Sequence, residues 1–432
     1  MSRVMKNSGI PWIGEIPRNW KVLRTKNVFS IGKDIVGAQS SNTQLLSLTT
    51  KGIKAIPVGS TSGKVPDSYD TYQVVHKNDL VMCLFDLDCS AVFSGLSSID
   101  GMISPAYKVL SIRGGFSPRF YDYWYAYIFD GRKYKFLSKN IRYSLTYDEF
   151  ASLGIVAPSF SEQEAIATFL DKKCGEIDEM ISLQERIVSG LIEYRDALIY
   201  ETIVEGALDH PKRRDSIIPG IDKIPTGWIE IKLKHLCSFH NGDRSESYPS
   251  GDDFVVTGVP FYGADSLNGF YVDINKARYI TEEKYNSLGG LKIIAGDILY
   301  TLRGSTIGKN AMAIRSVGTT ASSLMAIRVK SSLVDNRMLL YILNSPIEHF
   351  QRDVCINGST APNLSAVNVG EFIIPVPPIE EQHAIVGYLD EKCSIINSLI
   401  KAKQIKIDAL REYKKSIIYE YVTGKKEVPY GE

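Results

Sequence analysis

The stretch TLRGSTIGK (residues 301–309) places an arginine on a glycine-containing loop, directly after the strand-like run DILYT. An arginine on such a loop can pair bidentately with a guanine edge or clamp a phosphate. The hydroxyl and ammonium groups that follow are ordinary phosphate donors. The stretch therefore predicts a nucleic-acid contact, and the alternative is a hairpin turn with a surface arginine. The candidate residues are Arg303, Gly304, Ser305, Thr306 and Lys309.

Two other chemistries fit the residues less well. A nucleotide-binding P-loop needs four residues between its glycines and a final Ser or Thr, whereas GSTIGKN has three, and Asn310 ends it. Asp86 and Asp88 stand two apart, but no histidine or third carboxylate accompanies them at ligand spacing. These patterns disfavour an ATPase and a metal-dependent nuclease, and we expect neither a metal nor a cofactor in this chain.

A second polar stretch, NGSTAPNLS (residues 357–365), gathers amides and hydroxyls. Asparagine amides can read adenine edges. Asn and Ser also form turns, and both interpretations stay open. The candidate residues are Asn357, Ser359, Thr360 and Asn363.

The first half of the chain offers clustered cations in KGIKAIPVGSTSGK and DGRKYKFLSKNIRYS. Cations interleaved with aromatic residues suit a phosphate backbone. The alternative is a solvated helix end whose long side chains cover apolar surface. The candidate residues are Lys51, Lys54, Lys64, Arg132, Lys133, Lys135, Lys139, Arg142 and Tyr143.

The net charge of +1 conceals blocks of opposite sign. Residues 1–150 carry +7, residues 151–210 carry −8, residues 211–370 carry +3 and residues 371–432 carry −1. Basic blocks suggest a polyanion as a partner. A total near zero suggests that the chain does not hold such a partner alone.

An internal repeat must position these residues. Residues 162–201 match residues 381–420 without a gap, with 16 identities in 40 positions, at an offset of 219. The starts GIPWIGEIPRNWKVL and IIPGIDKIPTGWIEI also match, at an offset of 208. The two copies of the repeat are thus alike at their starts and ends and differ in their middle segments. This is typical of a common scaffold that carries two different recognition domains.

Both matching segments are predicted to be helices of roughly 40 residues, because their apolar residues recur every three or four positions. Ser161 and Glu164 fit a capping box at the start of the first. Two such helices should pack antiparallel as a coiled-coil rod. The predicted packing residues are Ile166, Leu170, Cys174, Ile177, Ile181, Ile385, Leu389, Cys393, Ile396 and Ile400.

The middles alternate short apolar runs with turn residues, which predicts strand-rich mixed domains. The expected fold is α+β: two recognition domains separated by two long antiparallel coiled-coil helices, with a pseudo-twofold internal repeat. The predicted divisions are residues 1–157, a helix at 158–208, residues 209–376, and a helix with its tail at 377–432.

This layout resembles the specificity subunit of type I restriction–modification systems. VPPIEEQHAI and the helix after it resemble the family's spacer helix, and YEYVTGK resembles its usual end. GDILYTLRGSTIGK and NGSTAPNLS resemble motifs of its target-recognition domains. In the first half, LVMCLFDLDCS and NIRYSLT stand in their places, which resembles a different class of recognition domain.

The resemblance implies a non-catalytic subunit that reads a bipartite sequence in double-stranded DNA. Two modification (methyltransferase) subunits would hold the helices and use S-adenosylmethionine. Restriction subunits would add ATP- and Mg²⁺-dependent translocation and cleavage for phage defence. Two alternatives remain: a nuclease or methyltransferase with an unrecognised site, and a coiled-coil adaptor that does not bind DNA.

The composition predicts a cytoplasmic protein. Apolar residues make up 44% and charged residues 23% of the chain, as in soluble globular proteins. No signal-like start or membrane-length apolar run is recognised. The six cysteines lack any C-x-x-C pair, so we expect reduced thiols.

Overall fold

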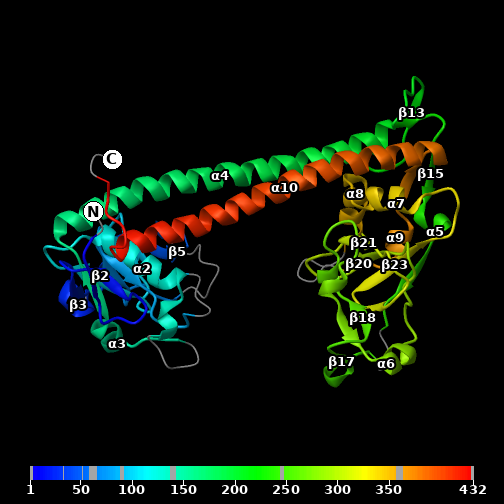
Figure 1. Cartoon of the computed structure of the whole chain (residues 1–432). Coiled ribbons are helices and arrows are strands. Elements are labelled where there is room, and N and C mark those ends of the chain that lie inside the picture. Colours follow the sequence, from blue (N-terminus) through cyan, green and yellow to red (C-terminus); the bar gives the residue numbers. More distant parts are fainter. Residues whose placement is uncertain are drawn as a thin grey trace. The chain divides into compact units, whose positions relative to one another are not determined.

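The computed structural model describes residues 3–32, 34–50, 52–57, 66–87, 92–136, 143–243, 248–356 and 363–429. The chain divides into two compact units. Unit 1 consists of Met1–Glu185 and Gln404–Glu432, and unit 2 of Arg186–Lys403. Each unit therefore contains one part of each long helix, α4 (Phe160–Glu205) and α10 (Ile379–Val422) (Figure 1).

Unit 1 contains an antiparallel four-stranded sheet of order β4-β11-β8-β9. Strand β3 pairs with β12, which joins the start of the unit to the segment just before α4. Helix α2 buries an aromatic face that includes Phe120, Trp124 and Tyr125. The elements are β1 (Met5–Asn7), β2 (Glu15–Pro17), β3 (Lys21–Arg24), α1 (Thr25–Val28), β4 (Phe29–Ile31), η1 (Gly37–Asn42), β5 (Leu46–Thr49), β6 (Gly52–Ala55), β7 (Gln73–Val75), β8 (Leu80–Met82), β9 (Ser94–Leu96), β10 (Gly101–Ile103), β11 (Lys108–Ile112), α2 (Pro118–Asp130), η2 (Lys133–Phe136), α3 (Tyr147–Ser152) and β12 (Gly154–Ala157).

Unit 2 repeats this plan with a sheet of order β16-β23-β20-β21 and a β15–β24 pair. It adds a second four-stranded sheet of order β17-β19-β18-β22. Its elements are β13 (Arg213–Asp215), β14 (Lys223–Pro225), β15 (Ile229–Lys232), α5 (Leu233–Leu236), β16 (Cys237–Asn241), η3 (Gly251–Asp253), β17 (Phe254–Val255), β18 (Val259–Tyr262), η4 (Ala264–Ser266), η5 (Ile274–Lys276), β19 (Arg278–Ile280), α6 (Glu282–Ser287), β20 (Ile298–Thr301), β21 (Asn310–Met312), β22 (Thr319–Thr320), β23 (Leu324–Val329), α7 (Asn336–Leu343), α8 (Pro346–Cys355), α9 (Ala366–Gly370) and β24 (Ile373–Val376).

A capping serine marks the start of α4, and a glycine follows the end of each long helix. Helix α4 begins at Phe160, and Ser159, rather than the expected Ser161, accepts a hydrogen bond from the Glu162 amide at 3.3 Å. Gly206 follows α4 with a φ of 88°, and Gly424 follows α10 with a φ of 70°. Glycine reaches this left-handed conformation without a Cβ penalty, which is why it ends helices.

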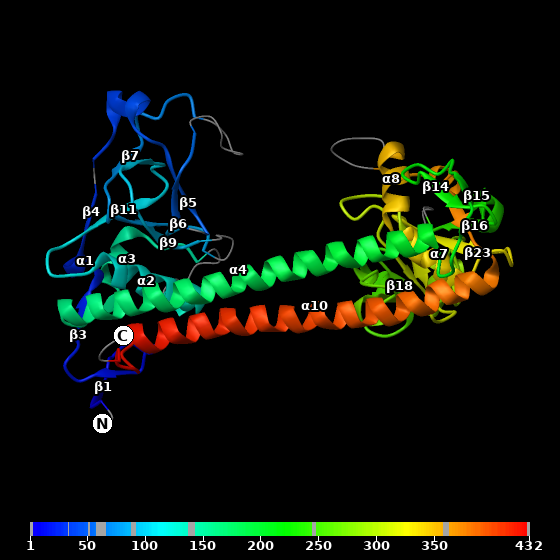
Figure 2. The same cartoon turned by 90° about the horizontal axis from the view of Figure 1, so that it is seen from above.

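Within each unit the two long helices lie side by side, as both views show (Figure 2). In unit 1, Lys414 pairs with Asp178 at 2.7 Å and Arg411 with Glu185 at 2.7 Å. The residue numbers fall on α10 as they rise on α4, so the two helices are antiparallel. In unit 2, Arg195 donates to Asn397 at 3.1 Å. The mixed helix-and-strand fold with two long helices is thereby confirmed.

The predicted packing residues are buried, apart from Ile181 and Ile400, which are half-buried. In unit 1 they share one hydrophobic cluster with α2 and the end of α10. In unit 2, Ile385, Leu389 and Cys393 share one with α7 and the end of α4, and this cluster does not include Ile396 or Ile400. The apolar stripe of each helix thus packs on a globular domain as well as on the other helix.

The repeated glutamines fasten each long helix to its domain. Gln163 is fully buried; it accepts from the Ser117 amide and donates to the Pro158 carbonyl, both at 2.8 Å. Gln382, also fully buried, accepts from the Asp335 amide and donates to the Pro377 carbonyl, again both at 2.8 Å. Ser117 and Asp335 are the N-caps of α2 and α7, so the same bond is made twice.

The repeated aspartates form a second contact between each long helix and its domain. Asp171 accepts from the Tyr123 hydroxyl at 2.9 Å and pairs with Arg119, both on α2. Asp390 accepts from the Tyr341 hydroxyl at 2.9 Å and pairs with Arg337 of α7. The sequence repeat therefore marks the surfaces at which the long helices dock on the two domains.

Candidate nucleic-acid interface

The candidate stretch at residues 301–309 connects β20 to β21 in a hairpin, and residues 303–306 at its tip are exposed. The Gly308 amide donates to the Thr301 carbonyl at 2.9 Å, and the Thr301 amide donates to the Lys309 carbonyl at 2.9 Å. Gly304 has a φ of 86°, which a residue with a side chain adopts only with strain. The strand below is buried on both faces, since the neighbouring residues Leu299 and Tyr300 are fully buried in two different hydrophobic clusters.

The structure brings two of the predicted candidates together across 60 positions of sequence. Arg303 and Asn363 form an isolated antiparallel bridge, and Arg303 Nε donates to Asn363 Oδ1 at 3.1 Å. The Leu364 amide donates to the Leu302 carbonyl at 2.9 Å, which fixes the two segments side by side. Arg303 makes no other hydrogen bond or ion pair within the described residues, so its two terminal nitrogens stay available to an acceptor.

The other residues of this loop take different positions. Ser305 and Thr306 are exposed, and the Lys309 ammonium donates to Asn268 Oδ1 at 2.8 Å. Lys309 is therefore held along the protein surface instead of extending into solvent. The candidates Asn357, Ser359 and Thr360 lie outside the described residues.

A buried carboxylic acid supports the hairpin from beneath. Glu348 of α8 is 2% exposed, accepts from the Tyr300 hydroxyl, and lies 3.2 Å from Arg352 Nη1. Burial raises the pKa of Glu348 to about 7, against the opposing effect of Arg352. A Cβ on Gly308 would collide with the Arg352 side chain, so the loop closely approaches this pair.

Of the cations predicted in unit 1, those from Arg132 onward follow helix α2. Arg132 has a left-handed φ of 48°, and the Lys135 ammonium lies 5.2 Å from the centre of the Tyr143 ring. Arg132 and Lys135 are exposed, as is Lys54 on β6. The candidates Lys51, Lys64, Lys139 and Arg142 lie outside the described residues.

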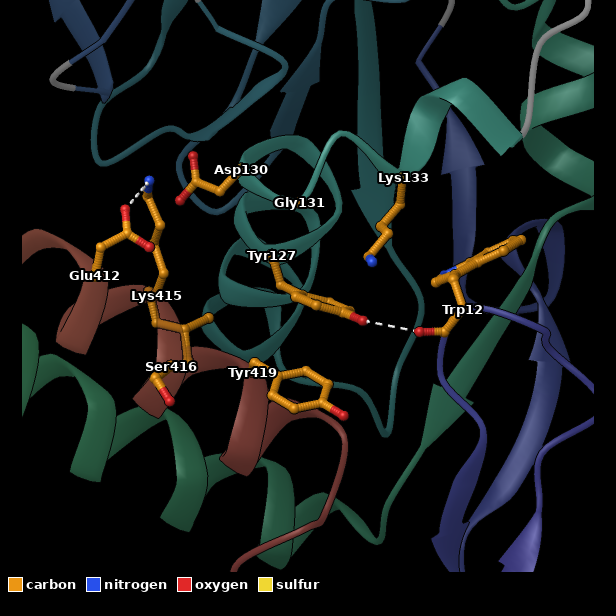
Figure 3. Close-up of a pocket in the computed structure, with 10 residues that line it drawn as sticks. Trp12, Tyr127, Asp130, Gly131, Lys133, Glu412, Lys415, Ser416 and Tyr419 are labelled. Atoms are coloured by element: carbon orange, nitrogen blue, oxygen red, sulfur yellow. Dashed lines mark hydrogen bonds and ion pairs between the residues drawn. The ribbon is translucent and has the colours of Figure 1, made fainter.

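Lys133 differs from its neighbours because it points into a pocket of about 450 Å³ (Figure 3). The end of α2 and the last turns of α10 line this pocket, together with the rings of Trp12, Tyr127 and Tyr419. The Tyr127 hydroxyl donates to the Trp12 carbonyl at 3.3 Å. Burial also raises the pKa of Asp130 at its rim. A lysine in this position is less accessible to a phosphate backbone than Arg132 or Lys135.

Within the residues that the structure describes, no three His, Cys, Asp or Glu side chains gather as a metal site would require. Of the helices in those ranges, none combines the length and apolar character needed to cross a bilayer.

Comparison with known proteins points to one family. Residues 225–409 match the sequence model of the type I restriction modification DNA specificity domain. The MjaVIII specificity subunit of a type I restriction enzyme from Methanocaldococcus jannaschii is 24% identical over 283 residues, or 64% of this chain. The EcoBI specificity subunit from Escherichia coli is 24% identical over 277 residues, or 62% of this chain. The chain spans 63% and 57% of the length of these two relatives.

The fold has a relative among solved structures. A chain from a structure that addresses complex assembly and conformational transition of the type I R-M system superposes with a TM-score of 0.68 at 16% identity. The match covers 95% of this chain and 99% of that chain. The resemblance drawn from the sequence is confirmed by these comparisons.

Proposed function

Since residues 225–409 belong to the type I restriction modification DNA specificity domain family, we propose that this chain is the DNA-recognition subunit of such a system. It reads a bipartite sequence in double-stranded DNA, one half with each unit, and directs partner subunits to that site. It catalyses no step itself.

One observation carries this proposal: the same domain plan occurs twice, each copy docked on a long helix through the same glutamine and aspartate. A protein that needs one binding site has no use for two such domains. Two readers fastened to helices suit two half-sites with unread base pairs between them. In unit 2, Arg303 and Asn363 together offer the donors and acceptors that read base edges.

The helices also offer a surface for partners. Tyr194 and Tyr413, which correspond in the repeat, are 60% and 59% exposed. Met180 and Leu399, which also correspond, are 43% and 46% exposed. Each unit thus presents one tyrosine and one aliphatic side chain from matching positions. Equivalent surfaces accept identical partners, and we assign them to two modification (methyltransferase) subunits, through which restriction subunits join the complex.

The remaining features of the proposal follow from this assignment. The partner subunits, and not this chain, use S-adenosylmethionine, ATP and Mg²⁺. The complex works on DNA in the cytoplasm.

Selection from random DNA tests the proposal. The chain is purified together with the methyltransferase subunits of its system, and bound duplexes are recovered from a randomised pool and sequenced. We expect two short conserved sequences at one fixed separation. Enrichment of no sequence, or of one uninterrupted sequence, would refute two-reader recognition. Methylation or cleavage by the purified chain alone would refute its non-catalytic role.

A further inference from the structure

Unit 1 has a loop that corresponds to the Arg303 loop, between β8 and β9. In unit 2 the Leu364 amide donates to the Leu302 carbonyl at 2.9 Å, and in unit 1 the Leu145 amide donates to the Leu84 carbonyl at 2.7 Å. Leu145 and Leu364 are 219 positions apart, which is the offset of the repeat. The residue after Leu84 therefore occupies the place of Arg303, and that residue is Phe85.

The two loops also share a residue with positive φ at the same place. The residue after Phe85 is Asp86, with a φ of 48°, and the residue after Arg303 is Gly304, with a φ of 86°. A left-handed aspartate is uncommon and indicates that the surrounding structure fixes the turn.

Corresponding neighbouring segments brace the two loops. The Asp86 amide donates to Ser144 Oγ at 3.0 Å, and Ser144 corresponds in the repeat to Asn363, which braces Arg303. The turn that presents Arg303 in unit 2 thus presents Phe85 in unit 1.

The surroundings of Phe85 are aromatic and open on one side. Phe85 is 40% exposed, and its ring centre lies 6.1 Å from that of Tyr107. Tyr143, which carries the Lys135 ammonium above its ring, directly precedes Ser144. A single exposed phenylalanine is ordinary on a protein surface. Here it stands at the position where the other unit presents a base-reading candidate. The Lys135 ammonium, which suits the phosphate backbone, lies over the ring next in sequence to the Ser144 that braces this loop.

We infer that Phe85 is a specificity-determining residue of the first unit and that it recognises thymine by packing against the C5-methyl group. The inference rests on the proposed function. A phenyl ring donates no hydrogen bond, so Phe85 cannot pair with guanine or phosphate as an arginine does. The apolar group that the major groove displays is the thymine methyl, and phenylalanine is among the residues that contact it. The two units therefore read with different chemistry from one loop position.

Removal of single methyl groups from the DNA tests this contact. Duplexes carrying the selected target are made with deoxyuridine in place of each thymine of the first half-site in turn, and their affinities for the complete complex are measured. At one position, we expect deoxyuridine to weaken binding roughly three- to five-fold, the effect of leaving one methyl group unburied.

The protein variants identify the side chain that makes the contact. With Phe85→Ala the loss at that position should vanish, and with Phe85→Leu most of it should persist, because leucine keeps an apolar surface there. Arg303→Ala is the matched control and should leave the deoxyuridine effect unchanged. Circular dichroism and assembly with the partners establish that each variant is folded.

Two other results overturn the inference. A deoxyuridine effect that survives in Phe85→Ala means that another residue contacts the methyl group. Weaker binding by Phe85→Ala without any sensitive thymine means that the ring acts as a wedge between base steps. Failure of the unaltered complex to select any sequence would refute the proposed function instead, before Phe85 is tested.

Discussion

Replacement of the buried Gln382 by alanine should loosen the joint between α10 and the domain of unit 2. Gln382 accepts from the Asp335 amide at 2.8 Å and donates to the carbonyls of Pro377 at 2.8 Å and Leu333 at 2.7 Å. Leu333 is half exposed, so its carbonyl can turn to water, whereas the other two groups lose their partner. Each buried polar group left unpaired costs about 1–3 kcal/mol, so for two groups we expect about 2–6 kcal/mol of local destabilisation.

Hydrogen exchange followed by mass spectrometry on the full chain measures this loss of local stability segment by segment. A change of about 2 kcal/mol corresponds to roughly 30-fold faster exchange, since every 1.4 kcal/mol is a factor of ten. We expect that acceleration in α7 and the first turns of α10, with the peptides of unit 1 unchanged, because local opening reports local stability.

A matched control and a reciprocal variant make the result decisive. Gln404 lies exposed on α10 and makes one long bond to Asp408, 3.3 Å, so Gln404→Ala should change nothing. Gln163→Ala should instead accelerate α2 and the start of α4. Exchange in Gln382→Ala that matches the unaltered chain, or that rises equally in both units, would refute the account of the repeated glutamines.

Three further predictions concern charge, base reading and assembly. Burial raises the pKa of Glu348 from 4.5 to about 7, so the stability that its proton contributes is complete below 4.5 and is lost as the pH rises through about 7. Glu348→Gln should therefore gain stability relative to the unaltered chain by up to about 3 kcal/mol between pH 5 and pH 8, and equal pH dependence in urea unfolding would contradict this. If Arg303 reads guanine, Arg303→Ala should cost about 1–3 kcal/mol of binding free energy at one base position; if Arg303 binds phosphate, the variant should bind all sequences more weakly and with a smaller salt dependence. Competition binding separates these outcomes, and unchanged affinity and salt dependence would exclude Arg303 from the interface. Tyr194→Ala with Tyr413→Ala should reduce co-purification of the methyltransferase subunits while leaving the circular dichroism of the chain unchanged; full recovery of the complex would place the partners elsewhere.

The repeat made the frame of this protein predictable from sequence. Matching apolar residues and the offset of 219 predicted two helices, and the structure has them as 46- and 44-residue elements. The buried positions were predictable because they depend on helical periodicity alone. The start of α4 was not: Ser159 caps it in place of Ser161, and either serine satisfies the local pattern.

The candidate site was predictable only in part. Arg303 was recognisable because its loop has glycines and a preceding strand, but its contact with Asn363 depends on a chain fold across 60 positions. Phe85 gave no signal, since a single phenylalanine between LVMCL and DLDCS belongs to no motif of nucleic-acid binding. Its correspondence to Arg303 rests on the equivalent hydrogen bonds that the carbonyls of Leu84 and Leu302 accept, which depend on the folded chain.

Replacing one recognition domain tests most directly the central claim that each unit reads its own half of the target. Residues 20–150 are replaced by the corresponding segment of a relative, and the methylated sites are mapped across a genome by sequencing in cells that supply the methyltransferase subunits. Two independent readers predict that one half of the bipartite target changes, while the other half and the separation between them stay the same. A target altered in both halves would contradict the account.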